Sequence, residues 1–161
     1  MIVVSNASPV VNLAAVNQLE LLRRLYQRVL IPEAVFRELR ASGLPQFRGG
    51  GEAEISWLAP RTVANRALVS SLLLELDGGE AEAIALATEA GADLLLIDER
   101  RGRRIAGSLG LRVLGLLGVL LEAKGKGLIN SVRQVLDELI AKAGFWIGQE
   151  LYERVLREAE E

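Results

Sequence analysis

The chain has 161 residues, half of them hydrophobic, which is enough for one domain with a sizeable core. Its 19 basic and 21 acidic residues give a net charge of −2, so the overall charge carries no signature of nucleic-acid binding. The absence of histidine and cysteine excludes disulfides, zinc-thiolate sites, thiol nucleophiles and Ser-His-Asp triads. Any catalysis must use oxygen groups, which favours a hard cation such as Mg²⁺ or Mn²⁺.

The first third of the chain predicts two short strands, each followed by helix. Ser8-Pro9 is typical of a helix start, with Ser8 as the N-cap and Pro9 in the first turn. Residues 42–54 hold four glycines and a proline and form the clearest loop. The predicted elements are a strand over 2–5, a helix from Ser8 to about residue 16, a helix over 19–26, a strand over 28–32 and a helix over 33–41.

The rest of the chain continues this alternation. Strands that alternate with helices predict a three-layer α/β/α sandwich with a mainly parallel sheet of about four strands. We expect residues 1–161 to form a single domain. The predicted elements here are helices over 64–76 and 80–90, a strand over 94–97, a helix over 99–109, a strand over 113–114, and helices over 116–124, 131–143 and 148–160.

No segment has the pattern of a targeting or membrane-spanning sequence. Residues 1–16 are apolar, but no basic segment precedes them and Ser5, Asn6 and Asn12 interrupt them. The longest strongly apolar stretch, 113–121, is too short to cross a bilayer. We therefore expect a cytoplasmic protein without a membrane contact.

Two of the predicted strands end in a polar residue and continue at once into a helix. Asn6 follows the strand over 2–5, and Asp98 follows the strand over 94–97. Side chains at the carboxyl ends of parallel strands line the ligand crevice of an open α/β sheet. Glu80 lies in the first turn of the intervening helix, so we expect Asn6, Asp98 and Glu80 to meet at one point.

Each candidate residue also has a purely structural explanation. Asp98 fits the N-cap of the helix that follows it, and Asn6 fits an Asx turn between strand and helix. Negative charge at Glu80 and Glu82 favours the macrodipole of their helix, and helical spacing turns Glu82 about 200° away from Glu80. Glu38, in the middle of its helix, fits a solvated face.

Four segments follow one another along the chain: SNASPVVNLA, PEAVFREL, DGGEAEAIALA and LLLIDERRGRRIA. Their order resembles the PIN domain, a metal-dependent ribonuclease fold that includes the toxin subunits of Vap-type toxin–antitoxin pairs. The resemblance implies that Asn6, Glu38, Glu80 and Asp98 are the catalytic and metal-binding residues, with Glu82 as an alternate and Glu99 beside the fourth. The tail GFWIGQELYERVLREAEE resembles that of one uncharacterised prokaryotic PIN subfamily.

The first motif departs from the family pattern, because Asn6 stands where the family has an acidic residue. An amide can still coordinate a cation through its carbonyl oxygen, but it supplies no charge. Two carboxylates about 4 Å apart repel by roughly 4 kcal/mol at an effective dielectric of 20. A divalent cation relieves that repulsion, so the loss of one carboxylate weakens the drive to bind it.

Further residues around the four candidates have expected supporting roles. Ser8, whose structural alternative is the helix cap, and Asn12 are expected to hydrogen-bond a site carboxylate. The four arginines after Asp98 are expected to contact RNA phosphates, the alternative being a solvated, salt-bridged helix; they are Arg100, Arg101, Arg103 and Arg104. Arg40, Arg48 and the Gly49-Gly50-Gly51 loop are expected to add a further contact.

The first functional hypothesis is a Mg²⁺- or Mn²⁺-dependent ribonuclease that hydrolyses single-stranded RNA, a toxin restrained by an antitoxin protein. The second is a PIN-like RNA- or protein-binding module that has lost catalysis, which Asn6 favours. A third is a doubly wound receiver or nucleotide-binding domain, in which Glu38 and Glu80 have no role. The leucine-rich helices at 64–76 and 116–124, together with the resemblance, predict a homodimer.

Overall fold

A computed structural model describes residues 1–48 and 55–161. It confirms the α/β class, and the described residues form one five-stranded, all-parallel sheet in the order β3-β2-β1-β4-β5. The strands are β1 (Val3–Ser5), β2 (Val29–Pro32), β3 (Leu58–Arg61), β4 (Leu94–Leu96) and β5 (Val113–Leu114). The helices are α1 (Ala7–Ala15), α2 (Glu20–Tyr26), α3 (Glu33–Ala41), the 3₁₀ turn η1 (Pro45–Phe47), α4 (Arg66–Leu72), α5 (Gly78–Ala90), α6 (Arg100–Ser108), α7 (Leu116–Gly125), α8 (Val132–Lys142) and α9 (Gln149–Glu158).

The sheet has one strand more than the sequence predicts. The additional strand, β3, pairs with β2 in parallel, with Leu58 opposite Val29. Its four residues include Pro60, which lacks a backbone N–H and is therefore tolerated on an edge strand rather than a central one. A strand that is this short and contains a proline has no clear alternating pattern.

Two helix starts differ from the predicted ones. The N-cap position of α1 is Asn6 rather than Ser8, because the Asn6 N–H still bonds the Leu96 carbonyl of β4 before the chain turns into the helix. Ser8 and Pro9 lie inside the first turn, where the missing N–H of a proline costs no intrahelical bond. The N-cap position of α6 is Glu99 rather than Asp98.

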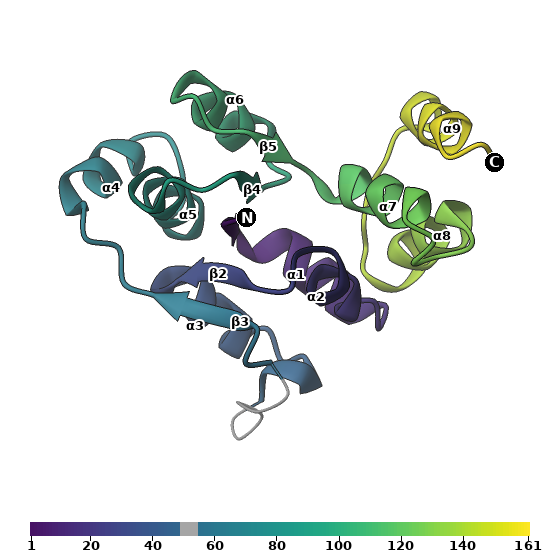
Figure 1. Ribbon diagram of the computed structural model, residues 1–161, viewed down its shortest axis with the longest axis horizontal. Helices are drawn as coiled ribbons and strands as arrows, with labels where there is room; N and C mark the ends of the chain where they lie inside the picture. The colour runs from purple at the N-terminus through teal and green to yellow at the C-terminus, as the bar shows by residue number, and fades with distance from the viewer. Residues whose placement is uncertain (49–54) are drawn as a thin grey trace.

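Helices cover both faces of the sheet and enclose two hydrophobic clusters. In Figure 1 the sheet runs from β3 at the bottom to β5 at the top, between α4 and α5 on one side and α1, α2, α7 and α8 on the other. Successive side chains of strand β4 point to opposite faces of the sheet. Leu94 and Leu96 pack in the cluster with α1 and α7, and Leu95 packs in the cluster with α5. Burial on both faces explains why β4 is continuously apolar.

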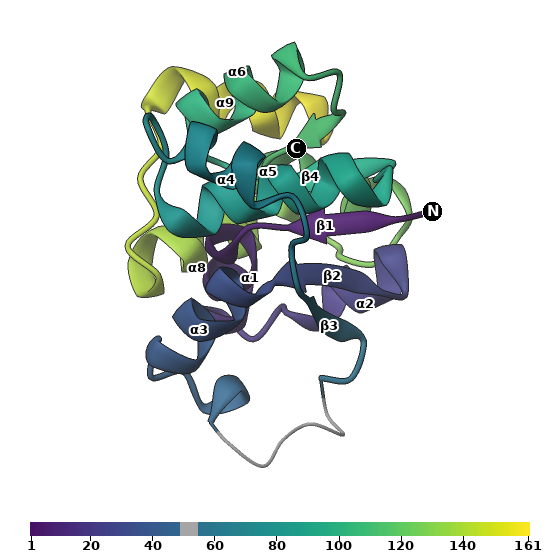
Figure 2. The same ribbon diagram turned by 90° about the vertical axis from the view of Figure 1, so that its left-hand side faces the viewer.

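The connections reverse direction between β1 and β4. The chain builds β1, β2 and β3 outward to one edge, then returns through α4 and α5 to place β4 on the other side of β1. Figure 2 shows β1 running from the N-terminus into α1 beside β2. Ligands of open α/β sheets bind at such a switch point, outside the carboxyl ends of the strands. No helix of the described residues is both long and apolar enough to cross a membrane.

Candidate functional site

A pocket of about 330 Å³ opens at this switch point, where β1 and β4 end. The structure brings all four candidate residues from the separate motifs to its wall, together with two further acidic side chains. No lysine or arginine is among the described residues that line it. The lining residues are Asn6, Ala7, Ser8, Val11, Asn12, Glu38, Asp77, Glu80, Asp98 and Glu99.

Asp98 is fixed by contacts from two helices. Its Oδ1 accepts the Leu116 N–H at the start of α7 at 2.6 Å, and its Oδ2 accepts the Ser8 hydroxyl at 3.3 Å. The expected Ser8 contact is therefore present. Asn12 reaches the carboxylate only indirectly, because its side-chain amide donates to the Ser8 oxygen at 3.3 Å. This arrangement holds the carboxylate in one orientation at the end of β4.

Glu38 and Asn6 converge on the N-terminal turn of α5. A Cβ built on Gly79 would overlap Glu38 Oε1 and lie 3.4 Å from Asn6 Oδ1, so both oxygens lie against this glycine and a larger residue would displace the Glu38 carboxylate. Asn6 makes no side-chain capping bond to α1, which leaves its carbonyl oxygen free to face the pocket. The Asx-turn explanation of Asn6 therefore does not account for its side chain.

Glu80 is held by a capping box at the start of α5. The Asp77 carboxylate accepts the Glu80 N–H at 2.8 Å, and Glu80 Oε1 accepts the Asp77 N–H at 3.4 Å. The other oxygen, Glu80 Oε2, is buried without a hydrogen-bond partner in the described residues. Asp77 is a site residue that the sequence reasoning missed, although the Asp-x-x-Glu spacing of a capping box was the available signal.

The pocket concentrates negative charge in a partly desolvated place. Burial, the hydrogen bond with Asp77 and its charge, and the charge of Glu99 raise the pKa of Glu80 to about 7. Burial and the charge of Asp77 also raise the pKa of Glu38. Burial raises the pKa of Asp98 despite its two hydrogen bonds and the charge of Arg103. The charged forms of all three carboxyls are disfavoured, and a cation would reverse that.

The donor set fits a hard divalent cation. Its candidate ligands are the carboxylate oxygens of Glu38, Glu80 and Asp98 and the amide oxygen of Asn6, which are the ligand types that Mg²⁺ and Mn²⁺ prefer. Across residues 1–48 and 55–161, no three acidic side chains are close enough to share one ion directly. Mg²⁺ usually binds one or two carboxylates and keeps several waters, so such a cluster is not required.

Two other candidate carboxylates have different surroundings. Glu99 lies on the wall of the pocket and at the N-cap position of α6. Glu82 points away from the pocket: its Oε1 accepts the Ala34 N–H at 3.1 Å, and its Oε2 pairs with Arg66 at 3.3 Å. The expectation that Glu82 supports the site is wrong, because two positions along a helix turn a side chain to the opposite face. Glu82 instead stabilises the start of α3.

Glu82→Ala should lower the free energy of unfolding by about 1–3 kcal/mol, because it leaves the buried Ala34 N–H without a partner. Urea denaturation measures this loss. Glu82→Gln keeps an acceptor and should lose less. The change in melting temperature caused by Mn²⁺ should be the same in both variants as in the wild type. A variant that keeps its stability but loses this change would place Glu82 in the metal site.

Three arginines of α6 line a second pocket beside the acidic one. It is lined by Arg100, Arg101 and Arg104 with Leu76 and three acidic residues, and it shares Glu80 and Glu99 with the acidic pocket. Arg101 also donates to the Glu75 carbonyl at 3.4 Å. Arg103 lies apart, with NH1 3.1 Å from a Cβ built on Gly115, next to Asp98. Cationic side chains therefore border the carboxylates directly, whereas the expected Gly49-Gly50-Gly51 contact lies outside the described residues.

The stability of the cation-free protein should fall as pH rises from about 5 to about 8. The pKa of Glu80 is about 7 in the folded chain and 4.5 ordinarily, so within this range the folded state binds more protons than the unfolded state. Thermal melts in EDTA test this, and Glu80→Gln should flatten the dependence while Glu150→Gln, an exposed change on α9, should not. Melting temperatures that rise with pH would contradict the assignment.

Comparison with known families identifies the family of the chain. A family model described as a PIN domain matches residues 2–161, which includes all four candidate motifs and the C-terminal tail. The chain matches no curated protein. The PIN domain is a nuclease-type fold, so the hypothesis of a receiver or nucleotide-binding domain is wrong. With the family model covering nearly its whole length, the chain belongs to the PIN-domain family.

Proposed function

We propose that this protein is a divalent-metal-dependent endoribonuclease that cleaves single-stranded RNA and acts as the toxin of a toxin–antitoxin pair. The observation that carries the proposal is that Asn6, Glu38, Glu80 and Asp98, from four separate motifs, line one pocket that has no lysine or arginine among its described residues. Asn6, Glu38, Glu80 and Asp98 would hold Mg²⁺ or Mn²⁺. When bound, such a cation supplies an activated water and stabilises negative charge on the phosphate.

The chain's own residues would orient the cation and the substrate. Ser8 and the Leu116 N–H fix the direction of the Asp98 carboxylate, which limits the geometries available at the pocket. Arg100, Arg101 and Arg104 line the pocket that adjoins the acidic one, and there they would contact phosphates of a bound polynucleotide. The carboxylates repel RNA and the arginines attract it, so binding should need the cation.

Cleavage of a single-stranded RNA by the purified protein tests this function. We expect cleavage with Mn²⁺ or Mg²⁺, none in EDTA, and no effect of a zinc-selective chelator. Cleavage that persists in EDTA would overturn the metal-dependent mechanism. The toxin role has its own test, since induced expression should arrest growth of a bacterial host and Asp98→Asn should abolish the arrest. A cleaving protein that leaves growth unchanged would refute only the toxin role.

The second candidate function is a PIN-like binding module without catalysis, and Asn6 is the observation that favours it. The two functions differ in cation binding, because an ion that binds only the folded state raises the melting temperature. An increase with Mn²⁺ supports the enzyme. No increase, combined with RNA binding in EDTA, supports the module.

We also propose that the protein forms a homodimer and that an antitoxin binds it. The apolar surface that supports a dimer lies just after α4, where Leu73 and Leu74 are 48% and 86% exposed. Helix α7, the other predicted source, uses Leu116, Val119 and Leu120 in the core of the protomer instead. Light scattering tests the dimer, and a monomer at micromolar concentration would exclude it.

A further inference from the structure

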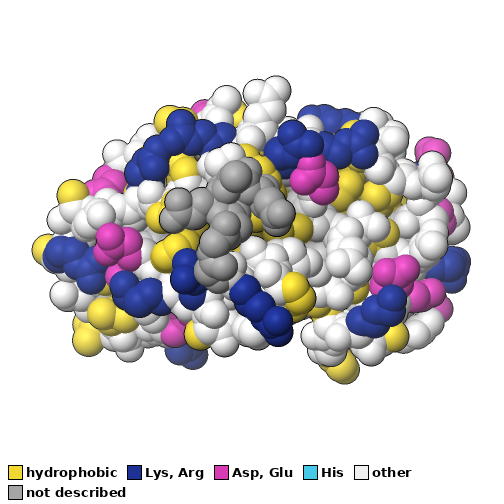
Figure 3. Space-filling model, turned by 90° about the horizontal axis from the view of Figure 1, so that it is seen from below, with side chains coloured by type: hydrophobic (Ala, Val, Ile, Leu, Met, Phe, Trp, Pro, Cys, Tyr) yellow, Lys and Arg dark blue, Asp and Glu magenta, His cyan; other side chains and the backbone are white. Residues whose placement is uncertain are grey.

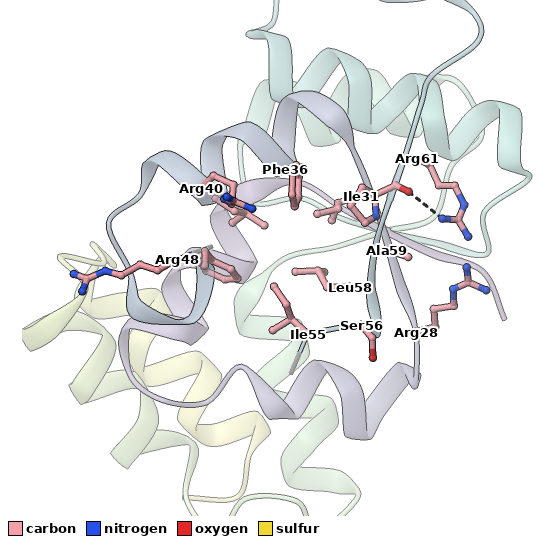
Figure 4. A pocket seen from close by; sticks show the side chains of 13 residues that line it. Arg28, Ile31, Phe36, Arg40, Arg48, Ile55, Ser56, Leu58, Ala59 and Arg61 are labelled. Carbon is pink, nitrogen blue, oxygen red and sulfur yellow. Dashed lines mark hydrogen bonds between the residues drawn. The ribbon is translucent and has the colours of Figure 1, made fainter. Parts of the chain in front are cut away.

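A second cavity, of about 400 Å³, lies between α3 and the edge strand β3 (Figure 4). Its floor is apolar and includes Ile31 of β2, Phe36 of α3, Phe47 of η1 and Leu58 of β3. Phe36 lies two positions from Glu38, so α3 presents opposite faces to this cavity and to the acidic pocket. The cavity is therefore separate from the candidate active site. We call it the α3–β3 cavity.

Four arginines surround the apolar floor of the α3–β3 cavity. Arg28 and Arg61 lie on one side of it and Arg40 and Arg48 on the other (Figure 4). None of the four forms an ion pair with a carboxylate in the described part of the chain. Figure 3 shows the same face of the molecule, where Lys and Arg side chains lie around hydrophobic ones.

The described contacts of these arginines leave their charge uncompensated. The Arg40 guanidinium lies over the Phe36 ring, 5.6 Å from its centre. Arg48 donates to the Gly43 carbonyl at 3.4 Å, and Arg61 to the Pro60 carbonyl at 2.9 Å. All four side chains are exposed. They form a positively charged cluster on a protein whose net charge is −2. This cluster is therefore a local feature of the surface and not a consequence of composition.

We propose that the α3–β3 cavity binds an acidic, apolar segment of a partner protein. An apolar side chain of that segment enters the floor, and flanking Asp or Glu residues pair with the arginines. The arginines lie on two sides of the floor, which matches carboxylates spaced along a peptide better than the single headgroup of a small amphiphile. Aromatic and arginine side chains around a desolvated centre are also the usual composition of protein-binding hot spots.

The lining of the cavity favours a peptide over RNA. Ile31 and Leu58 are aliphatic, and Arg40 already covers one of the two phenylalanine rings. The floor therefore offers little surface for stacking bases, which is the sequence-tolerant way in which proteins hold single-stranded RNA. Because Glu80 and Asp98 are not part of this cavity, binding here needs no divalent cation, and the proposal stands independently of the nuclease function.

Fluorescence anisotropy with labelled peptides in EDTA tests the proposal. The probe is a short peptide in which Glu alternates with Leu and Phe. One control peptide replaces every Glu with Lys, and the other replaces every Leu and Phe with Ser. We expect the acidic apolar peptide to bind at least about tenfold more tightly than either control, because only it matches both the charge and the floor.

Charge reversal on the protein locates the site. Arg40→Glu with Arg48→Glu should weaken binding of the acidic apolar peptide at least about tenfold, because repulsion replaces attraction on one side of the floor. Arg157→Glu, an exposed change on α9 outside the cavity, should leave the affinity unchanged. If the double variant does not fold, Arg28→Glu with Arg61→Glu tests the other side of the cavity in the same way.

Three results would overturn the proposal. Equal binding of the Ser control peptide would mean that only charge is recognised and that the floor has no role. Unchanged affinity in the folded charge-reversal variants would place the peptide elsewhere. A short uridine RNA that binds more tightly than the peptide in EDTA, and loses its affinity in the same variants, would assign the cavity to nucleic acid.

Discussion

Asp98→Asn should lower RNA cleavage by about 100-fold or more while the protein remains folded. The substitution removes one negative charge from the donor set, and changes to groups that only orient metal ligands already cost about 10–100-fold. The fold should tolerate it, because an amide oxygen can still accept the Leu116 N–H and the Ser8 hydroxyl can turn to accept the amide N–H. Initial cleavage rates measured with saturating Mn²⁺ give the loss.

Asp137→Asn is the matched control for this loss. Asp137 is exposed on α8, far from the pocket in sequence and absent from its wall, and its Oδ1 accepts the Tyr152 hydroxyl at 2.6 Å. The same chemical change there keeps a hydrogen-bond acceptor and should leave cleavage at the wild-type rate. Equal rates for wild type and Asp98→Asn would mean that another site or another protein cleaves the RNA.

The sequence predicts the carboxyl ends of the central strands well. Asn6 and Asp98 each follow a short strand of fully buried residues, β1 and β4, whose residues are mostly apolar because helices cover both faces of the sheet. The bounds of α3 and β5 agree with the structure to the residue, and Glu38 and Glu80 reach the same pocket as Asn6 and Asp98. The local sequence pattern therefore predicts the position of a site residue where a strand is fully buried and a polar residue follows its end.

Other features depend on contacts between segments far apart in the chain. Nothing in the sequence indicates that Gly79 lies against the Glu38 carboxylate, because Glu38 belongs to another helix. Nor does it show that Glu82 bonds the start of α3 at Ala34, 48 positions earlier. The α3–β3 cavity likewise forms only when β3 pairs with β2, and β3 is the strand that the sequence pattern conceals.

Asn6→Asp should strengthen binding of Mn²⁺ or Mg²⁺ by about tenfold or more, and cleavage should rise or stay level. It restores the missing charge with a side chain of the same size, and one added charge near a cation is worth several kcal/mol at an effective dielectric of about 20. In EDTA the same change should lower the melting temperature. An Asp at the N-cap position of α1 gains up to about 1 kcal/mol from the helix dipole. Repulsion from Glu38, whose carboxylate also lies beside Gly79, should exceed this gain, because unit charges a few Å apart repel by several kcal/mol at an effective dielectric of about 20.

The sign of the stability change therefore separates an ion-binding pocket from structural caps. For Asn6→Asp we expect a loss of melting temperature in EDTA and a recovery beyond the wild-type value when Mn²⁺ is added, because the ion binds only the folded state. Asn12→Asp is the control, since its side chain contacts Ser8 rather than Glu38 or Gly79, and its response to Mn²⁺ should be smaller. If Asn6→Asp binds no cation and is more stable than the wild type in EDTA, then the carboxylates cap helices and the non-catalytic binding module is the correct function.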